Sequence, residues 1–185
     1  MQLHHLQAPL TEAQLLPLRA GDEVLINGFI YVARDAAHQR MAALMAAGKP
    51  LPFDPQGQII YYMGPTPPKP GQVIGSAGPT TSGRVDRYTP ALLAAGIKAT
   101  IGKGYRSDAV REAMVQHKAV YLAAIGGAGA LISRSIRQRA VIAWPELGTE
   151  ALQRLAVQDF SSFVVNDLEG NDLYEQGQAQ FQQEA

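Results

Sequence analysis

The central part of the chain alternates short apolar segments, rich in β-branched residues, with segments of helical spacing. Glycine-rich or charged turns separate them, which predicts strands connected by helices. An apparent hairpin at 23–33, turning at Asn27-Gly28, and a further turn at 169–171 add antiparallel elements. The pattern predicts an α/β fold, a layered domain with a mixed sheet. The expected strands are 59–63, 97–101, 119–124, 141–144 and 163–167, and the expected helices are 35–47, one through Leu92-Leu93, and 107–117.

Neither a repeat nor a low-complexity linker divides the chain, so residues 1–185 are interpreted as one domain with loose ends. The 16 basic and 16 acidic residues cancel, which gives no field that favours nucleic acid or an anionic membrane. No apolar run approaches the roughly 20 residues that span a bilayer. With a polar start, no secretory signal and no cysteine, the expected location is the cytoplasm. The charged fraction of 17% fits either surface covered by a partner or an alanine-rich soluble chain.

Several familiar motifs fail on spacing. The segment from Gly96 to Lys103 is one residue too long for a phosphate loop, and Gly104 stands where a Ser or Thr is needed to bind Mg²⁺. The run 126–129 lacks the spacing of a dinucleotide-binding turn. His4 and His5 lie at a loose end, and no histidine pair has helical metal-ligand spacing, so we expect no metal site on this chain.

Three turns that each follow a predicted strand and precede a predicted helix carry the candidate chemistry, because open α/β sheets bind ligands there. The first holds Arg34 and Asp35, where Asp35 could simply cap a helix. The second, Gly78 to Arg84, combines two threonines, a serine and an arginine, and could also be an ordinary capping turn. The third projects Lys103 between two glycines, although a solvated lysine is equally compatible.

Arg34, Arg84 and Lys103 would together place three positive charges at one edge of the sheet. That is more charge than a monocarboxylate requires, and it favours a dicarboxylate ligand. The chain supplies no thiolate, so an electrophile or Lewis acid would have to come from another source.

At these residues the sequence resembles the C-terminal domain, or separate β subunit, of the class I iron–sulfur fumarate hydratase and L-tartrate dehydratase family. The resemblance extends from about Gly21 to Tyr174, and the threonine pair in the Gly78 to Arg84 turn is its most specific part. The matching segments are Ala33 to His38, Gly78 to Arg84, Lys103-Gly104 with Arg106-Ser107, Ile125 to Gly127, Pro145 to Gly148, and Asp167 with Gly170 to Asp172.

The resemblance implies a swivelling β/β/α domain that packs against a larger α part, whose three cysteines hold a 4Fe–4S cluster with one open iron position. It implies that Arg34, Arg84 and Lys103 bind the substrate carboxylates together with Thr81, and that Thr80 is the base that takes the C3 proton. A buried carboxylate or histidine of the partner would perturb the Thr80 hydroxyl. The expected assembly contains two α and two β subunits. His38 is assigned a structural role beside the Arg34 turn.

Fumarate hydratase is the favoured activity. Tyr105, Val85 and Ala128-Gly129 depart from the commonest fumarase form, and Arg106-Ser107 favours fumarate and malate over tartrate. L-tartrate dehydratase, or another 2-hydroxydiacid dehydratase, is the alternative within the same class. A dicarboxylate-binding module without catalysis is the alternative outside it.

Overall fold

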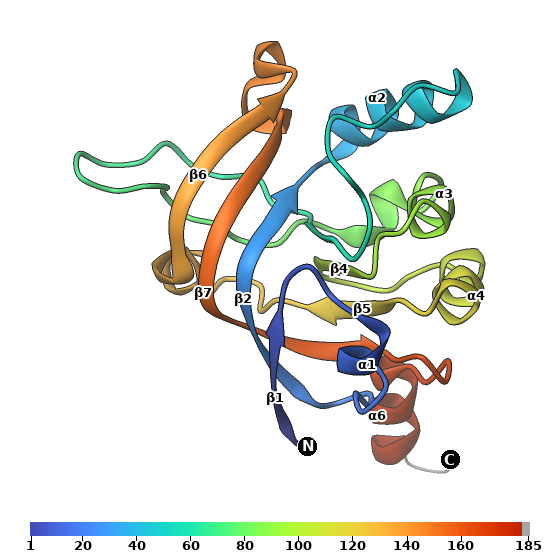
Figure 1. Cartoon of the computed structure of the whole chain (residues 1–185). Coiled ribbons are helices and arrows are strands. Elements are labelled where there is room, and N and C mark those ends of the chain that lie inside the picture. The colour runs from blue at the N-terminus through green and yellow to red at the C-terminus, as the bar shows by residue number, and fades with distance from the viewer. Residues whose placement is uncertain (183–185) are drawn as a thin grey trace.

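In the computed structural model, which describes residues 1–182, the chain forms a mixed seven-stranded sheet with helices against it (Figure 1). The order of the strands is β1-β2-β3-β4-β5-β7-β6. The strands are β1 (Leu3–Gln7), β2 (Glu23–Val32), β3 (Ile59–Tyr61), β4 (Ala99–Gly102), β5 (Val120–Ala123), β6 (Ile136–Ala143) and β7 (Leu152–Asn166). The helices are α1 (Glu12–Leu15), α2 (Asp35–Ala46), α3 (Thr89–Ala94), α4 (Asp108–His117), α5 (Gly129–Ile132) and α6 (Leu173–Phe181), with 3₁₀ segments η1 (Ser82–Val85), η2 (Ser133–Ser135) and η3 (Pro145–Glu150).

The first five strands run parallel to their neighbours, whereas β7 is antiparallel to β2, β5 and β6. Because the long strand β7 pairs with β2 and also with β5, the sheet closes on itself. The predicted α/β class with a mixed sheet is therefore confirmed. Among the described residues, no helix combines the length and the apolar character that crossing a membrane requires.

The two faces of the sheet bury separate apolar clusters, because neighbouring side chains on a strand point to opposite faces. Ile59 and Tyr61 of β3 join one cluster with Phe160 of β7, and Ile60 joins the other. The second cluster includes Met41 of α2 and residues of α3 and α4, which cover that face of the sheet (Figure 1). The sheet is thus buried on both faces, as expected for strands connected by helices.

The hairpin predicted at Asn27-Gly28 is wrong, because β2 continues straight through these residues. Gly28, at φ +105°, lies beside a shift in the register with β7, where Gln158 and Asp159 of β7 lie opposite Asn27; the irregularity is a β-bulge in β7 and not a turn in β2. A Cβ atom at Gly28 would come within 2.8 Å of the Ala8 carbonyl oxygen. Asn27 bonds across the ladder to Asp159, with its Oδ1 accepting the Asp159 N–H at 3.0 Å. Glycine is needed here because the Ala8 segment approaches the backbone closely. In the sequence, such a glycine after an asparagine looks the same as the glycine of a hairpin turn.

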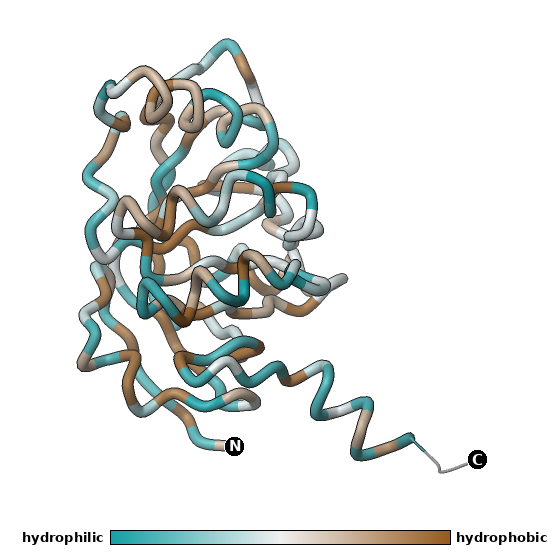
Figure 2. The backbone as a smooth tube through the Cα atoms, turned by 90° about the vertical axis from the view of Figure 1, so that its right-hand side faces the viewer, coloured by the Kyte–Doolittle hydropathy of each residue, from teal (hydrophilic) through white to brown (hydrophobic). Residues whose placement is uncertain are grey.

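The chain ends also differ from the prediction. His4 and His5 belong to β1 and do not lie on a loose end. The C-terminal end forms helix α6, which runs to Phe181 and projects away from the body of the chain (Figure 2), while residues 183–185 lie outside the described part. The late strands are longer than expected, because β6 begins at Ile136 and β7 at Leu152.

Asp22 attaches β1 to the rest of the sheet. Its carboxylate accepts hydrogen bonds from the N–H groups of Gln2 at 2.7 Å and Arg19 at 3.0 Å, and lies 3.2 Å from His4 Nε2. Burial alone would raise the pKa of Asp22, but these hydrogen bonds outweigh it and hold the pKa below its ordinary value of 3.8.

We predict that Asp22→Asn lowers the free energy of unfolding by about 2 kcal/mol at pH 7, because charge-assisted hydrogen bonds are lost. A lowered pKa stabilises the fold above the pKa of the unfolded carboxyl and ceases to do so as the pH falls through the folded value. Urea unfolding should therefore show a gap between wild type and variant that closes below about pH 4. A gap that persists at pH 2 would contradict the assigned role of the carboxylate.

Candidate active site

Strands β2 to β5 run parallel, so their carboxyl ends lie along one edge of the sheet, here called the carboxyl edge. The chain leaves this edge through segments that begin near Arg34 after β2, Gly64 after β3, Lys103 after β4 and Ile125 after β5. Ligand sites in α/β sheets form at such edges. Two of the three turns singled out in the sequence follow these strands directly.

The third turn, Gly78 to Arg84, returns to the carboxyl edge and pairs between the ends of β3 and β4. The Thr80 N–H donates to the Tyr62 carbonyl at 2.8 Å, and the Thr80 carbonyl accepts the Lys103 N–H at 3.2 Å. Ser82 N–H then donates to the Lys103 carbonyl at 2.9 Å, which makes Thr81 and Lys103 partners in a parallel bridge. The threonine pair and Lys103 are therefore held side by side by backbone hydrogen bonds.

Arg84 reaches from this turn to the Arg34 turn. Its Nε donates to Asp35 Oδ1 at 3.2 Å, and its Nη2 lies 3.1 Å from Asp35 Oδ2. This side-on pair leaves Nη1 for another acceptor. The predicted capping role of Asp35 is wrong: Arg34 occupies the N-cap position of α2, and the Asp35 carboxylate pairs with Arg84.

Arg34 lies against Gly64, because a Cβ atom there would come within 2.7 Å of Arg34 Nη1. Its Nη2 is 3.6 Å from Glu150 Oε1, whereas its buried Nε has no partner among the described residues. The sequence reasoning did not identify Glu150, whose Oε2 also accepts the Ala36 N–H at 2.9 Å. Glu150 belongs to the η3 segment, which lies more than 100 residues after Arg34 in the sequence, so no local pattern indicates this contact. The Arg34 side chain as a whole is 20% exposed, so a ligand at the edge would meet its outer part and not the buried Nε.

The remaining side chains differ in exposure. Lys103 and Thr81 are exposed and Thr80 is half-buried, so all three can meet a ligand at the carboxyl edge. A Cβ atom at Gly126 would lie 3.8 Å from Lys103 Cδ, which places the lysine stem beside the turn after β5. All the residues predicted for the site, Arg34, Thr80, Thr81, Arg84 and Lys103, therefore lie along this edge of the sheet. What each does to a ligand remains a prediction.

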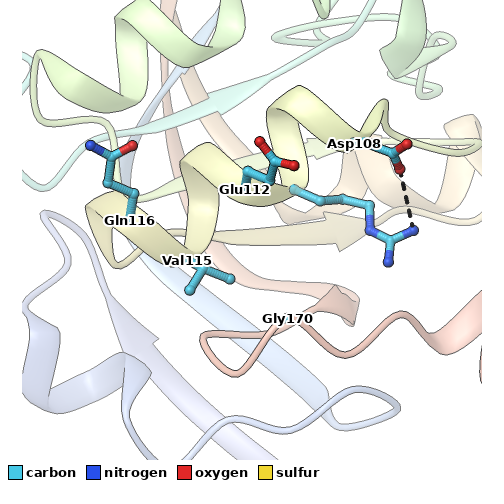
Figure 3. Close-up of a pocket in the computed structure, with 6 residues that line it drawn as sticks. Asp108, Glu112, Val115, Gln116 and Gly170 are labelled. Atoms are coloured by element: carbon cyan, nitrogen blue, oxygen red, sulfur yellow. Dashed lines mark ion pairs between the residues drawn. The ribbon is translucent and has the colours of Figure 1, made fainter.

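Helix α4 and the Gly170 turn line a separate, open surface pocket of about 480 Å³ (Figure 3). Charged side chains line it, but Arg111 forms ion pairs with Glu175 and, at 3.9 Å, with Asp108. Charges that already pair with one another are poorly suited to capture a diacid. No group of three or more His, Asp or Glu side chains within residues 1–182 is arranged to hold a metal ion.

The model of the family described as "Fumarase C-terminus" matches residues 2–177. "Fumarate hydratase 2" of Leishmania major is 42% identical over 163 residues, which cover 87% of this chain and 29% of that protein. "Fumarate hydratase class I, anaerobic" of Escherichia coli (strain K12) is 39% identical over 175 residues, 92% of this chain and 32% of that protein. "Putative L(+)-tartrate dehydratase subunit beta" of Methanocaldococcus jannaschii is 36% identical over 173 residues, 90% of this chain and 89% of that protein. The chain thus spans about a third of these fumarate hydratases and most of the archaeal subunit.

His38 supports the Arg34 turn from below, in agreement with its predicted structural role. The fully buried ring donates from Nδ1 to the Arg34 carbonyl at 2.8 Å and packs beside the Tyr62 ring. Burial, reinforced by the nearby Arg106 charge, lowers the pKa of His38 to about 4. The imidazole is therefore neutral at physiological pH.

We predict a pH dependence of stability that His38→Asn removes. Because the pKa of His38 is lower in the folded state than its ordinary 6.5, stability is complete above that value and declines as the pH falls toward 4. Relative to the variant, wild type should lose about 3 kcal/mol of unfolding free energy between pH 7 and pH 4. Parallel urea titrations measure this difference, and identical pH profiles would show that His38 does not titrate in the window.

Proposed function

Because the chain belongs to the fumarase C-terminus family, we propose that it is one part of a hydro-lyase that interconverts fumarate and L-malate. The rest of the enzyme is a larger companion part. The archaeal relative is named a β subunit, and the fumarate hydratases are about three times as long as the matched region. We further propose an assembly of two chains of each kind in the cytoplasm.

The observation that carries this proposal is that Arg34, Arg84 and Lys103 lie along the carboxyl edge together with the Thr80-Thr81 pair. Arg84 is exposed and its pair with Asp35 leaves Nη1 to bind a carboxylate oxygen in a directional way, while the partly exposed Arg34 adds a second positive charge. Lys103 adds a point charge from the next strand. Two carboxylates bound at separate points would fix the carbon chain of a C4 diacid between them, with Thr81 lining the same edge.

Dehydration of malate removes a proton from C3 and the hydroxyl group from C2. We assign proton removal to Thr80, whose backbone is fixed on both sides by Tyr62 and Lys103. A hydroxyl is a weak base, so its surroundings must favour the alkoxide; the neighbouring cations do so, and a group of the companion part would complete the effect.

An iron–sulfur cluster does not fit the residues of this chain. Such clusters are held by cysteine thiolates, and the sequence contains no cysteine. The cluster that the family resemblance implies would therefore belong to the companion part. This chain's contribution is to bind, orient and deprotonate.

We predict that Thr80→Ala in the assembled enzyme lowers kcat for malate dehydration by about 10²- to 10⁴-fold, the usual contribution of a general base. KM should change little, because the carboxylate anchors remain. Thr80→Ser, which retains the hydroxyl, is the matched control and should keep much of the activity. The absorbance of fumarate measures turnover, and full activity of Thr80→Ala would refute this assignment.

Tartrate dehydration is the second candidate, favoured by the near-complete coverage of the archaeal β subunit. If malate is the substrate, kcat/KM for malate should exceed that for L-tartrate by at least about tenfold, since the two differ by one hydroxyl that the site must accommodate or reject. Assays of both diacids with one preparation give the ratio. A reversed ratio would assign the chain to the tartrate branch.

A further inference from the structure

Two buried hydroxyl groups connect the turn from Gly78 to Arg84, here called the threonine turn, to the turn from Gly102 to Gly104, here called the Lys103 turn. Tyr121 of β5 donates its hydroxyl proton to the Gly104 carbonyl at 2.9 Å. The same oxygen lies 2.8 Å from Ser82 Oγ. A carbonyl can only accept, so the single Tyr121 proton is used there, and Ser82 must donate to Tyr121. The result is a directional relay from Ser82 through Tyr121 to Gly104.

This relay joins the two segments that carry the proposed base and the proposed lysine. Ser82 is two residues beyond Thr80, and Gly104 directly follows Lys103. Backbone hydrogen bonds already fix Lys103 on both sides, but Gly104 lies at φ +81°, in a region where glycine alone is unstrained. The Tyr121 hydroxyl restrains the carbonyl of this permissive residue, so that the Gly104–Tyr105 peptide, which directly follows the Lys103–Gly104 peptide, has one orientation.

The surrounding packing leaves room for the relay only because β4 ends in glycine. A Cβ atom at Gly102 would come within 2.1 Å of Ser82 Oγ and 2.9 Å of a Tyr62 ring carbon. Real Cβ atoms do not approach other atoms so closely, so any larger residue would displace Ser82.

Arg106 fixes the tyrosine from the other side. Its guanidinium lies 5.0 Å from the Tyr121 ring centre and donates to Asp86, Thr89 and Thr100 at 2.8, 2.8 and 3.0 Å. The Arg106 side chain is fully enclosed and is therefore not available to a ligand. Burial raises the pKa of Tyr121, so the phenol keeps the proton that the relay requires.

We propose that Ser82 and Tyr121 are positioning residues, which hold Lys103 at a fixed place relative to Thr80. This inference rests on the proposed function. A shift of Lys103 would affect kcat more than KM. An ammonium attracts a carboxylate over a range of positions, whereas proton removal from C3 tolerates little displacement.

The test compares Ser82→Ala, Tyr121→Phe and the double variant in the assembled enzyme, with malate as the substrate. Each single variant should lower kcat about tenfold with KM changed less than about threefold. Because the two hydroxyls act in series, the double variant should resemble either single variant. Tyr31→Phe, which removes the hydroxyl of a buried tyrosine stacked on Phe53, is the matched control and should retain the wild-type kcat. Unchanged kcat in both single variants, or effects that multiply in the double variant, would overturn the inference.

A second measurement is independent of turnover. Amide hydrogen exchange of Lys103 in this chain alone should quicken in Ser82→Ala and Tyr121→Phe and remain unchanged in Tyr31→Phe, with thermal unfolding confirming that each variant is folded. If the assembled wild-type enzyme does not dehydrate malate but the variants show this exchange pattern, the proposed function is refuted while the restraint on Lys103 is established. Unchanged exchange would refute the restraint itself.

Discussion

The backbone pairing of Thr80 to Ser82 with Tyr62 and Lys103 is the contact on which the candidate site depends. These hydrogen bonds extend the parallel sheet beyond its carboxyl edge. The added segment, Thr80 to Ser82, belongs to the connection between β3 and β4 and pairs with the residues that follow both strands. A loop held only by side chains would move relative to the strands. A loop held by a ladder of N–H and carbonyl groups shares the rigidity of the sheet. The Thr80 hydroxyl and the Lys103 ammonium therefore have a common frame.

The charged groups follow from this frame. Each arginine of the edge has a carboxylate beside it: Asp35 beside Arg84 and Glu150 beside Arg34. Such pairs between partly exposed groups contribute little to stability. Their value lies in geometry, because each pair holds one part of a guanidinium in a fixed orientation at the carboxyl edge. The buried charge of Arg106 has a different purpose, since its hydrogen bonds join α3, β4 and Asp86, the residue that follows η1, into one unit.

Prediction from sequence succeeded where the local signal and the tertiary environment agree. The strand at Ile59 to Tyr61 and the helix from Asp35 were identified because their residues have a clear periodicity and are buried as that periodicity requires. It failed at Gly28, where a glycine that serves the close approach of Ala8 resembles the glycine of a turn. It failed again at β1, because the polar run Leu3 to Gln7 acquires its strand structure from pairing with β2 and from the Asp22 carboxylate. Pairing partners distant in sequence leave no local trace.

The sequence by itself determined the fold class, the absence of cysteine and the residue types that gather at the turns, because alternation, composition and glycine spacing are local properties. Only the tertiary structure decided which side chains lie exposed at the carboxyl edge and which are buried in the scaffold. Asp35 orients an arginine instead of capping a helix, Glu150 arrives from a distant segment, and Arg106 is enclosed three residues from an exposed Lys103. The physical reason is that a charge acts through its distance to other charges and to water, and those distances exist only once the sheet has brought its strand ends together.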